Sequence, residues 1–171
     1  MKANAFLYGS LMALALGVAA ISSAHAAPND PVEVEADQLD IDQGAGTAVY
    51  RGNVEVRQGE MRLRGDKVEI QRNEAGELSR ATAIGNRAYM RHRPEGQEEV
   101  MEGQAQRIIY HLAERRVELI DRAELTQGGD RFTGGRLEYF IDRDVVQARS
   151  DVEGSENQRI RMTLQPEQPS E

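Results

Sequence analysis

The chain offers few side chains that could carry out catalysis. It has no cysteine and three histidines, His25, His92 and His111. His92 stands in an arginine-rich stretch typical of a loop, and His111 stands between Tyr110 and Leu112, which predicts that it points to solvent. Two histidines in such different surroundings form no metal-binding motif, and no serine lies in a nucleophile elbow. We therefore expect no metal, no cofactor, and neither Ser/His/Asp nor thiol chemistry.

Clustered carboxylates are the next candidates, because paired acids hydrolyse glycosidic bonds. The acids that cluster are Asp37, Asp40, Asp42, Glu98, Glu99 and Glu102. Asp40 and Asp42 alternate with Leu39 and Ile41, so they face outward, and the glutamates lie in an insertion between apolar stretches. The glycines form neither of the phosphate-binding motifs of nucleotide enzymes. The sequence therefore favours a protein that is not an enzyme.

The charge of the chain excludes two kinds of partner. Its 171 residues carry 21 Lys and Arg against 29 Asp and Glu, a formal net charge of −8. A nucleic-acid-binding domain needs a basic face to meet phosphates, so no nucleic acid is expected as a partner. The same acidity argues against electrostatic adhesion to anionic lipid.

Residues 1–26 have the composition of a cleaved secretory signal peptide. Lys2 is their only charged residue, an apolar run follows, and Ala24-His25-Ala26 provides a small-residue cleavage site. The apolar run is shorter than the ~20 residues that span a bilayer. We expect a mature protein in the periplasm, with residues 27–165 as one domain and 166–171 as a disordered tail.

Apolar and polar residues alternate along nearly all of the remaining chain. Period-two alternation is typical of β-strands that bury one face. Glycine, Asn or Asp interrupts it every ~8–12 residues, which indicates an all-β sandwich, jelly roll or solenoid. The alternating stretches include Val54-x-Val56, Val68-x-Ile70, Ile108-x-Tyr110-x-Leu112, Val117-x-Leu119 and Leu137-x-Tyr139.

An internal repeat resolves one ambiguous segment. Residues 104–119 contain good helix formers. A shift of 69 residues, however, overlays the chain on itself and places Leu39 on Ile108 and Val54 on Ala123. The two copies share alternation rather than helix propensity, so we interpret 104–119 as strands. One such unit cannot bury its apolar face alone, so the stacked units must share a core and end in exposed strand edges.

Eight short motifs follow one another in a fixed order along this repeat. They are 31–37 (PVEVEAD), 50–59 (YRGNVEVRQG), 63–68 (LRGDKV), 85–88 (GNRA), 102–105 (EGQA), 110–113 (YHLA), 125–130 (LTQGGD) and 134–139 (GGRLEY). Their arrangement resembles the OstA-like family of LptA-type proteins of lipopolysaccharide export, over about residues 31–152. One departure is Asp121-Arg122-Ala123, where the family often has Gly-Asn-Ala, so a turn glycine is missing there.

The resemblance implies an all-β fold, an open, V-shaped antiparallel β-jelly roll of about 16 strands with an apolar inside. It also implies a role, because proteins of this family join head to tail into a bridge across the periplasm. An LptC-like inner-membrane subunit would meet the N-terminal edge, and an LptD-like outer-membrane protein would meet the C-terminal edge. Lipopolysaccharide would slide along the groove with its lipid A acyl chains inside, driven by ATP hydrolysis at the inner membrane, so the protein itself needs no catalytic residue.

Twelve apolar residues are candidates for the lipid-binding groove. The resemblance implies lipid contact at Val32, Val34, Met90, Tyr110 and Leu112. Alternation predicts seven further inward-facing side chains, Ile41, Val56, Val68, Leu119, Leu125, Phe132 and Tyr139. For each of the twelve, a core role without lipid contact stays open, because burial stabilises an apolar side chain by about 1.5–3 kcal/mol in either case.

The sequence leaves other functions open. A structural adaptor of the cell envelope would pair through the same strand edges and bind no acyl chain. A carbohydrate-active enzyme on a β-helix would need an inward-facing carboxylate pair, which the alternation does not supply. An LptC-like protein would keep residues 1–26 as a membrane anchor, and mass spectrometry of the mature N-terminus would identify it.

Overall fold

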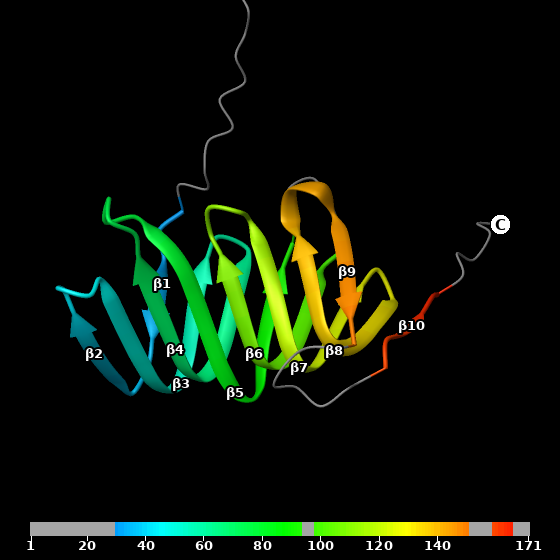
Figure 1. The fold of residues 1–171 in the computed structure, drawn as a ribbon, viewed down its shortest axis with the longest axis horizontal. Helices are drawn as coiled ribbons and strands as arrows, with labels where there is room; N and C mark the ends of the chain where they lie inside the picture. Colours follow the sequence, from blue (N-terminus) through cyan, green and yellow to red (C-terminus); the bar gives the residue numbers. More distant parts are fainter. Residues whose placement is uncertain (1–29, 94–97, 151–158, 166–171) are drawn as a thin grey trace, which may run out of the picture.

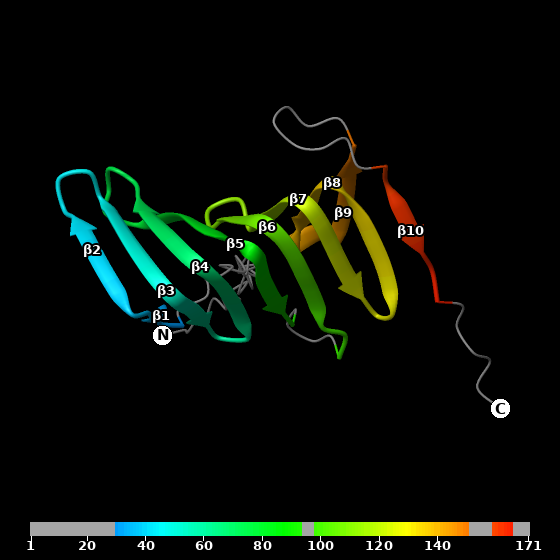
Figure 2. The same cartoon turned by 90° about the horizontal axis from the view of Figure 1, so that it is seen from below.

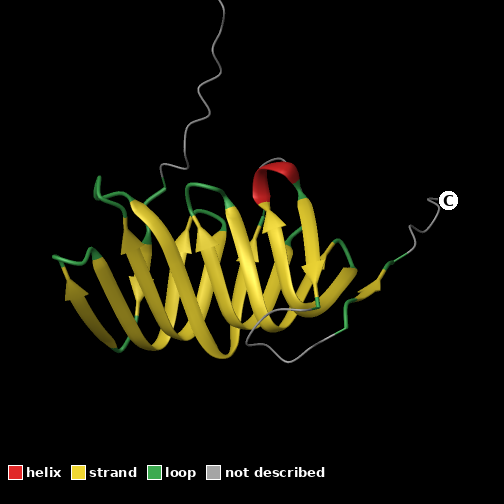
Figure 3. Ribbon diagram, viewed as in Figure 1, coloured by secondary structure: helices red, strands yellow, loops and turns green. Residues whose placement is uncertain are grey.

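A single antiparallel sheet makes up nearly all of the structure. The computed structural model describes residues 30–93, 98–150 and 159–165. Figure 3 shows one short helical turn among the strands, the 3₁₀ helix η1 (Ile141–Arg143). The strands are β1 (Glu33–Glu35), β2 (Gln38–Asp42), β3 (Thr47–Gln58), β4 (Met61–Arg72), β5 (Leu78–His92), β6 (Met101–His111), β7 (Arg116–Gln127), β8 (Asp130–Phe140), β9 (Val145–Arg149) and β10 (Arg161–Thr163). β6 and β7 confirm that 104–119 forms strands.

Consecutive strands lie side by side, so the order in the sheet follows the order in the chain (Figure 1). β3 to β8 form the middle of the sheet. At one edge β1 and β2 pair with the two halves of β3, and at the opposite edge β10 and β9 pair with the two halves of β8. Figure 2 shows these two edges at opposite ends of the molecule.

Each long strand is interrupted near its middle. The pairing register shifts between Arg51 and Val54 in β3, and equivalent shifts occur in every following pair up to β7 with β8. Such bulges bend a strand and increase its twist, and here they line up across the sheet. The six long strands therefore act as twelve halves, which with β1, β2, β9 and β10 account for the sixteen strands that the resemblance implies.

The bulges also explain how β7 accommodates Asp121-Arg122-Ala123, the tripeptide that lacks the turn glycine of the family. In β3, Gly52 and Asn53 have φ angles of 79° and 45°, a left-handed conformation that glycine and asparagine tolerate. The residues 69 positions later, Asp121 and Arg122, have φ angles of 63° and 51°. The repeat therefore keeps its backbone bend where the glycine is missing. A side chain is forced into the left-handed region at Asp121 instead.

The aligned bulges divide the sheet into two halves that face each other. Arm A consists of 33–35, 54–58, 61–65, 88–92, 101–105, 123–127, 130–134 and 161–163. Arm B consists of 38–42, 47–51, 67–72, 78–84, 107–111, 116–120, 136–140 and 145–149. The inward residues of both arms form one buried cluster, in which Val68, Ile108 and Leu137 are fully buried. The predicted open β-jelly roll with an apolar inside is thus confirmed.

Candidate functional site

Three rows of apolar side chains cross the inner face of the sheet from one edge to the other. Each row follows directly paired residues on successive strands. Arm A carries Val34–Val56–Leu63–Met90–Gly103–Leu125–Phe132–Met162. Arm B carries Ile41–Ala48–Ile70–Ala81–Tyr110–Val117–Tyr139–Val146 and Leu39–Tyr50–Val68–Ala83–Ile108–Leu119–Leu137–Ala148. Ten of the twelve predicted groove residues lie in these rows.

Two neighbouring cavities lie between the arms near the N-terminal edge. The larger has a volume of about 510 Å³, and Val32, Val34, Ile41, Tyr50, Ile70 and Leu78 are among the residues that line it. The smaller measures about 30 Å³ and shares Val32, Ile70 and Leu78 with the larger one. Together they form a groove, which we call the N-terminal groove. Its larger part falls within the ~300–1,000 Å³ typical of sites that bind small molecules.

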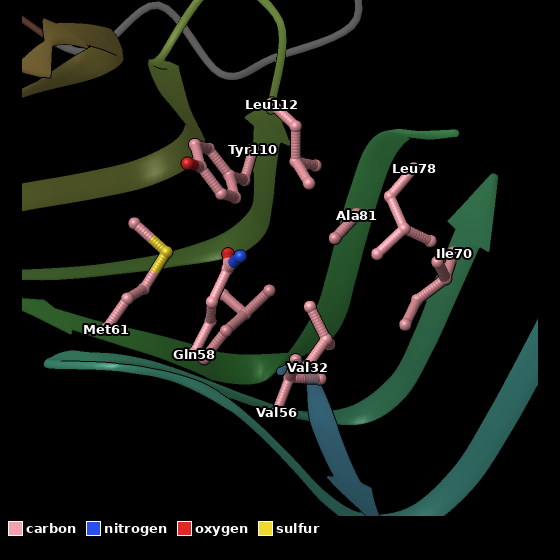
Figure 4. A pocket seen from close by; sticks show the side chains of 10 residues that line it. Val32, Val56, Gln58, Met61, Ile70, Leu78, Ala81, Tyr110 and Leu112 are labelled. Atoms are coloured by element: carbon pink, nitrogen blue, oxygen red, sulfur yellow. The ribbon is translucent and has the colours of Figure 1, made fainter. Parts of the chain in front are cut away.

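The lining of the N-terminal groove is apolar, with polar groups at its border. Figure 4 shows Val32 and Val56 on one side of the smaller cavity and Leu78, Ala81 and Tyr110 on the other. The polar residues that border the larger cavity are Asp42, Gln43, Thr47 and Arg72. Such a lining suits an apolar chain whose polar end stays outside.

Towards the C-terminal edge the space between the arms is filled. Leu119, Leu125, Leu137 and Tyr139 are completely buried. Their side chains fill the space between the arms at this end, whereas the corresponding space is empty in the N-terminal groove. An acyl chain could therefore enter here only if the arms moved apart.

The structure thus divides the predicted groove residues into three groups. Val32, Val34, Ile41, Val56, Tyr110 and Leu112 line the cavities. Val68, Met90, Leu119, Leu125 and Tyr139 belong to the buried interior, and Phe132 packs against it partly exposed. Lipid contact stays a prediction for all twelve.

Seven apolar lining residues were not among the predicted ones, namely Ala48, Tyr50, Met61, Leu63, Ile70, Leu78 and Ala81. Met61, Leu63 and Ile70 stand in alternating stretches, so their inward direction could be read from the sequence. Leu78 follows the β4–β5 turn, where the repeat is interrupted. Sequence periodicity gives no signal for which inward residues border a cavity, because that depends on how closely the arms approach.

Burial shifts the pKa of two groups, Tyr110 in the lining of the groove and His92 at the end of β5, towards the neutral form. Burial raises the pKa of Tyr110; Arg115 opposes this effect and Asp142 adds to it. Burial also lowers the pKa of His92, helped by the charge of Arg115, although Glu60 opposes it. Within the described residues, no group of three His, Asp or Glu side chains could hold a metal ion.

The most deeply buried charges lie on the outer face of arm B. Glu118 is 6% exposed, accepts a hydrogen bond from Arg116 and receives another from Arg136 at 2.7 Å. The prediction that His111 points to solvent is wrong, because its side chain is 14% exposed and its Nε2 lies 3.0 Å from Glu118. This arrangement is an ion cluster that links β6, β7 and β8.

The signal peptide (1–26) and the tail (166–171) that the sequence predicts lie outside the described residues. In the described part of the chain, no helix has the length and apolar character that crossing a membrane requires.

Comparisons with known proteins agree with this architecture. Residues 33–145 match the family described as "LptA/(LptD N-terminal domain) LPS transport protein". The lipopolysaccharide export system protein LptH of Pseudomonas aeruginosa is 33% identical over 95% of this chain and 90% of its own. Its Escherichia coli K12 counterpart LptA is 27% identical over 96% and 85%.

A solved structure gives the same result for the fold. The crystal structure of LptH, the LptA homologous periplasmic component of the lipopolysaccharide transport device from Pseudomonas aeruginosa, superposes with a TM-score of 0.76. The superposition covers 82% of this chain and 99% of that one, at 32% sequence identity.

Proposed function

Since this chain belongs to the LptA/(LptD N-terminal domain) family of lipopolysaccharide transport proteins, we propose that it binds lipopolysaccharide in the periplasm and carries it between the two membranes. The acyl chains of lipid A lie between arms A and B, and the phosphorylated sugars remain outside. Residues 1–26 direct export and are then removed. The protein works as a carrier and not as an enzyme.

The observation that carries this proposal is the N-terminal groove. It is apolar inside, has polar groups at its border, and is about 510 Å³ in its larger part. The apolar rows of both arms extend from this groove to the opposite edge. Burial stabilises an acyl chain by about 0.8 kcal/mol for each CH₂ group. Because this free energy involves no directional bond, none has to break when the acyl chain moves along the groove by one CH₂ group. Such a surface supports sliding as well as binding.

Both ends of the sheet support assembly into a bridge. β1 and β2 form one edge, and β9 and β10 form the other, so all four present unpaired backbone groups. The strands alternate in direction across eight positions, so the N-terminal edge of a second copy continues the antiparallel pattern after β9 and β10. Leu39 and Ile41 at one edge and Met162 at the other are at least half exposed, and such a junction would cover them.

The charges of the two edges are complementary. The charged side chains of β1 and β2 are all acidic: Glu33, Glu35, Asp40 and Asp42. Those of β9 and β10 are both basic, Arg149 and Arg161. Opposite charges steer association and exclude the like-edge pairing of two N-terminal edges. We therefore propose a head-to-tail oligomer.

The same edges suit the partners that the resemblance implies. An LptC-like inner-membrane subunit would pair with β1 and β2, and an LptD-like outer-membrane protein with β9 and β10. For the second partner, the family description includes the LptD N-terminal domain. The LPS-assembly protein LptD of Aeromonas hydrophila is also 46% identical over 59 residues, 34% of this chain and 7% of its own. A domain of similar fold could continue the sheet.

Lipid binding can be tested with a matched pair of tyrosines. Tyr110 lines the N-terminal groove, whereas Tyr89 lies on the outer face of β5 and donates a hydrogen bond to Glu102. The photo-crosslinking residue p-benzoylphenylalanine would replace one or the other in protein that is then mixed with purified lipopolysaccharide. We expect an adduct at Tyr110 and little at Tyr89. Equal adducts at both, or none at Tyr110 in folded protein, would refute the carrier and favour an adaptor without lipid.

Head-to-tail assembly can be tested separately by sedimentation velocity over a range of concentrations. Arg161→Glu reverses a charge at the C-terminal edge, while Arg131→Glu reverses one within the sheet, where Arg131 lies 3.8 Å from Glu124. We expect Arg161→Glu to weaken self-association at least tenfold and Arg131→Glu to leave it nearly unchanged. Equal effects of the two variants, or a monomer at every concentration, would contradict pairing through the edges.

A further inference from the structure

One side-chain contact joins the far ends of the two arms. Gln127 ends β7 on arm A, and Asp144 directly precedes β9 on arm B. The Nε2 of Gln127 donates a hydrogen bond of 2.9 Å to Oδ1 of Asp144. The hydroxyl of Tyr139 donates to the same oxygen at 3.0 Å. Among the side-chain hydrogen bonds of the described residues, Gln127–Asp144 alone links the arms at their ends.

The short helix η1 completes this contact. Ile141, its first residue, is 7% exposed and belongs to the buried cluster. Its backbone N–H donates to the carbonyl of Arg115 at 2.9 Å, so η1 is attached to the β6–β7 turn. We refer to Gln127, Tyr139, Ile141 and Asp144 as the clasp.

The clasp holds a residue in an unfavourable conformation. Asp144 has a φ angle of 50°, a left-handed conformation that costs a non-glycine residue free energy. This conformation directs its carboxylate to two donors at once, Gln127 and Tyr139. A strained residue persists only where surrounding contacts hold it. Loss of the Gln127–Asp144 hydrogen bond is therefore expected to let this turn relax to a more favourable backbone conformation.

The clasp joins the arms at β7 and β8, on the C-terminal side of the N-terminal groove. Tyr110 of the N-terminal groove is paired with Val117, and Val117 is paired with Tyr139 of the clasp. Leu119 and Leu125 on β7 and Leu137 on β8, the two strands that the clasp joins, have no exposed surface, although they continue the same apolar rows. Apolar side chains suited to contact with lipid therefore cross the whole sheet, but the space between the arms is open only in its N-terminal part. We call these rows of apolar side chains the lipid path.

We propose that the clasp is a gate on this path, an inference that rests on the proposed carrier function. When Gln127 and Asp144 separate, the arms part and an acyl chain moves from the N-terminal groove to the leucines of β7 and β8. When they rejoin, the space at these leucines closes again. A hydrogen bond suits this task, since the packed interior it guards reopens without any covalent step.

The gate can be tested with photo-leucine, a diazirine analogue of nearly the same shape as leucine. Protein containing it would be irradiated with purified lipopolysaccharide, and the adducts mapped by mass spectrometry. Leu63, Leu78 and Leu112 report on the N-terminal groove. Leu119, Leu125 and Leu137 report on the interior at β7 and β8 that the clasp closes. The measured quantity is the ratio of adducts at these three leucines to adducts in the groove.

Three forms are compared with the parent protein. Gln127→Ala opens the clasp, and Gln104→Ala is the matched control because Gln104 accepts its hydrogen bond from Arg87 on the outer face. In the third form, Gln127→Cys and Asp144→Cys are bridged by a short bis-maleimide, which is selective since the chain has no other cysteine. We expect the ratio to rise at least threefold in Gln127→Ala, to stay constant in Gln104→Ala, and to fall when the bridge forms.

An unchanged ratio in all forms, with adducts present in the groove, would overturn the gate and leave the carrier function intact. Absence of adducts at every leucine would overturn both. Hydrogen exchange gives a measurement without lipid: the backbone amides of 125–127 and 139–141 are expected to exchange at least threefold faster in Gln127→Ala than in Gln104→Ala. Equal exchange in the two variants would contradict a gate held by this bond.

Discussion

The ion cluster on the outer face of arm B provides the most quantitative prediction of stability. Burial alone would raise the pKa of Glu118, but its hydrogen bond from Arg116 and the charges of Arg136, Arg116 and His111 outweigh that effect and lower the pKa. Glu118 is therefore ionised in the folded protein. The substitution Glu118→Gln keeps the shape of the side chain and removes this charge.

The cost of that substitution follows from the partners that remain. Breaking a buried ion pair usually costs about 3–5 kcal/mol, because a charge is left without compensation. Here Arg116 keeps Glu114 and Glu138, and Arg136 keeps Glu138 at 3.3 Å. We therefore expect the lower end of the range, about 3 kcal/mol, which lowers the melting temperature by roughly 6–12 °C in a domain of this size.

The assay is urea unfolding at several pH values, with Glu124→Gln as control. Glu124 is partly exposed and lies 3.8 Å from Arg131, so its substitution is expected to cost less than about 1 kcal/mol. Because the pKa of Glu118 is lower in the folded state, its contribution is complete above the unfolded pKa of about 4.3 and is lost as the pH falls through the folded pKa. If Glu118→Gln costs no more than Glu124→Gln, or if the difference grows as the pH falls below 4.3, the reasoning is refuted.

Three further substitutions test the bend, the packing and the groove. Asp121→Gly is expected to stabilise the fold by about 0.5–1 kcal/mol, since it relieves a φ of 63° and removes a buried Oδ1 without a hydrogen-bond partner; a loss of stability in urea unfolding would contradict this. Gly103→Ala is expected to cost about 1–3 kcal/mol, because the new Cβ would lie 2.6 Å from Leu119 and 2.9 Å from Met90; an unchanged unfolding midpoint would show that the interior is loosely packed. Ile41→Asp, at a residue 61% exposed, is expected to change stability by less than about 0.5 kcal/mol and to reduce lipopolysaccharide binding several-fold in a titration of dilute, monomeric protein; unchanged affinity would remove Ile41 from the groove.

The fold was predictable because its two controlling patterns, the apolar–polar alternation and the 69-residue repeat, can be read directly from the sequence. Alternation assigns each side chain to the inner or outer face, and the repeat identifies 104–119 as strands despite its helix formers. The bend was also visible in part, since Gly52-Asn53 marks the bulge of β3. At Asp121-Arg122 the same bend exists without its signal residues, because the pairing of β7 with β6 and β8 imposes the conformation on a sequence that disfavours it.

The site was less predictable, because a cavity is a property of how two arms pack. Val32 and Leu125 stand in similarly apolar stretches, yet Val32 lines the N-terminal groove and Leu125 is completely buried. His111 has the phase of a surface residue, but it is covered because its Nε2 lies 3.0 Å from Glu118 on the neighbouring strand, within the cluster that Arg116 and Arg136 form with Glu118. The clasp depends on a contact between β7 and a turn 17 residues away, for which periodicity gives no indication.

The central claim, that acyl chains occupy the N-terminal groove, can be measured directly by methyl NMR. Purified lipopolysaccharide carrying a nitroxide on an acyl chain would be added to protein with labelled Ile, Leu and Val methyl groups. The account predicts strong broadening of the signals of Val32, Ile70 and Leu78, which line the groove, and little broadening of Val145, which is exposed at the opposite edge. Equal broadening of Val145 and the groove residues, or broadening of Val145 alone, would contradict the account.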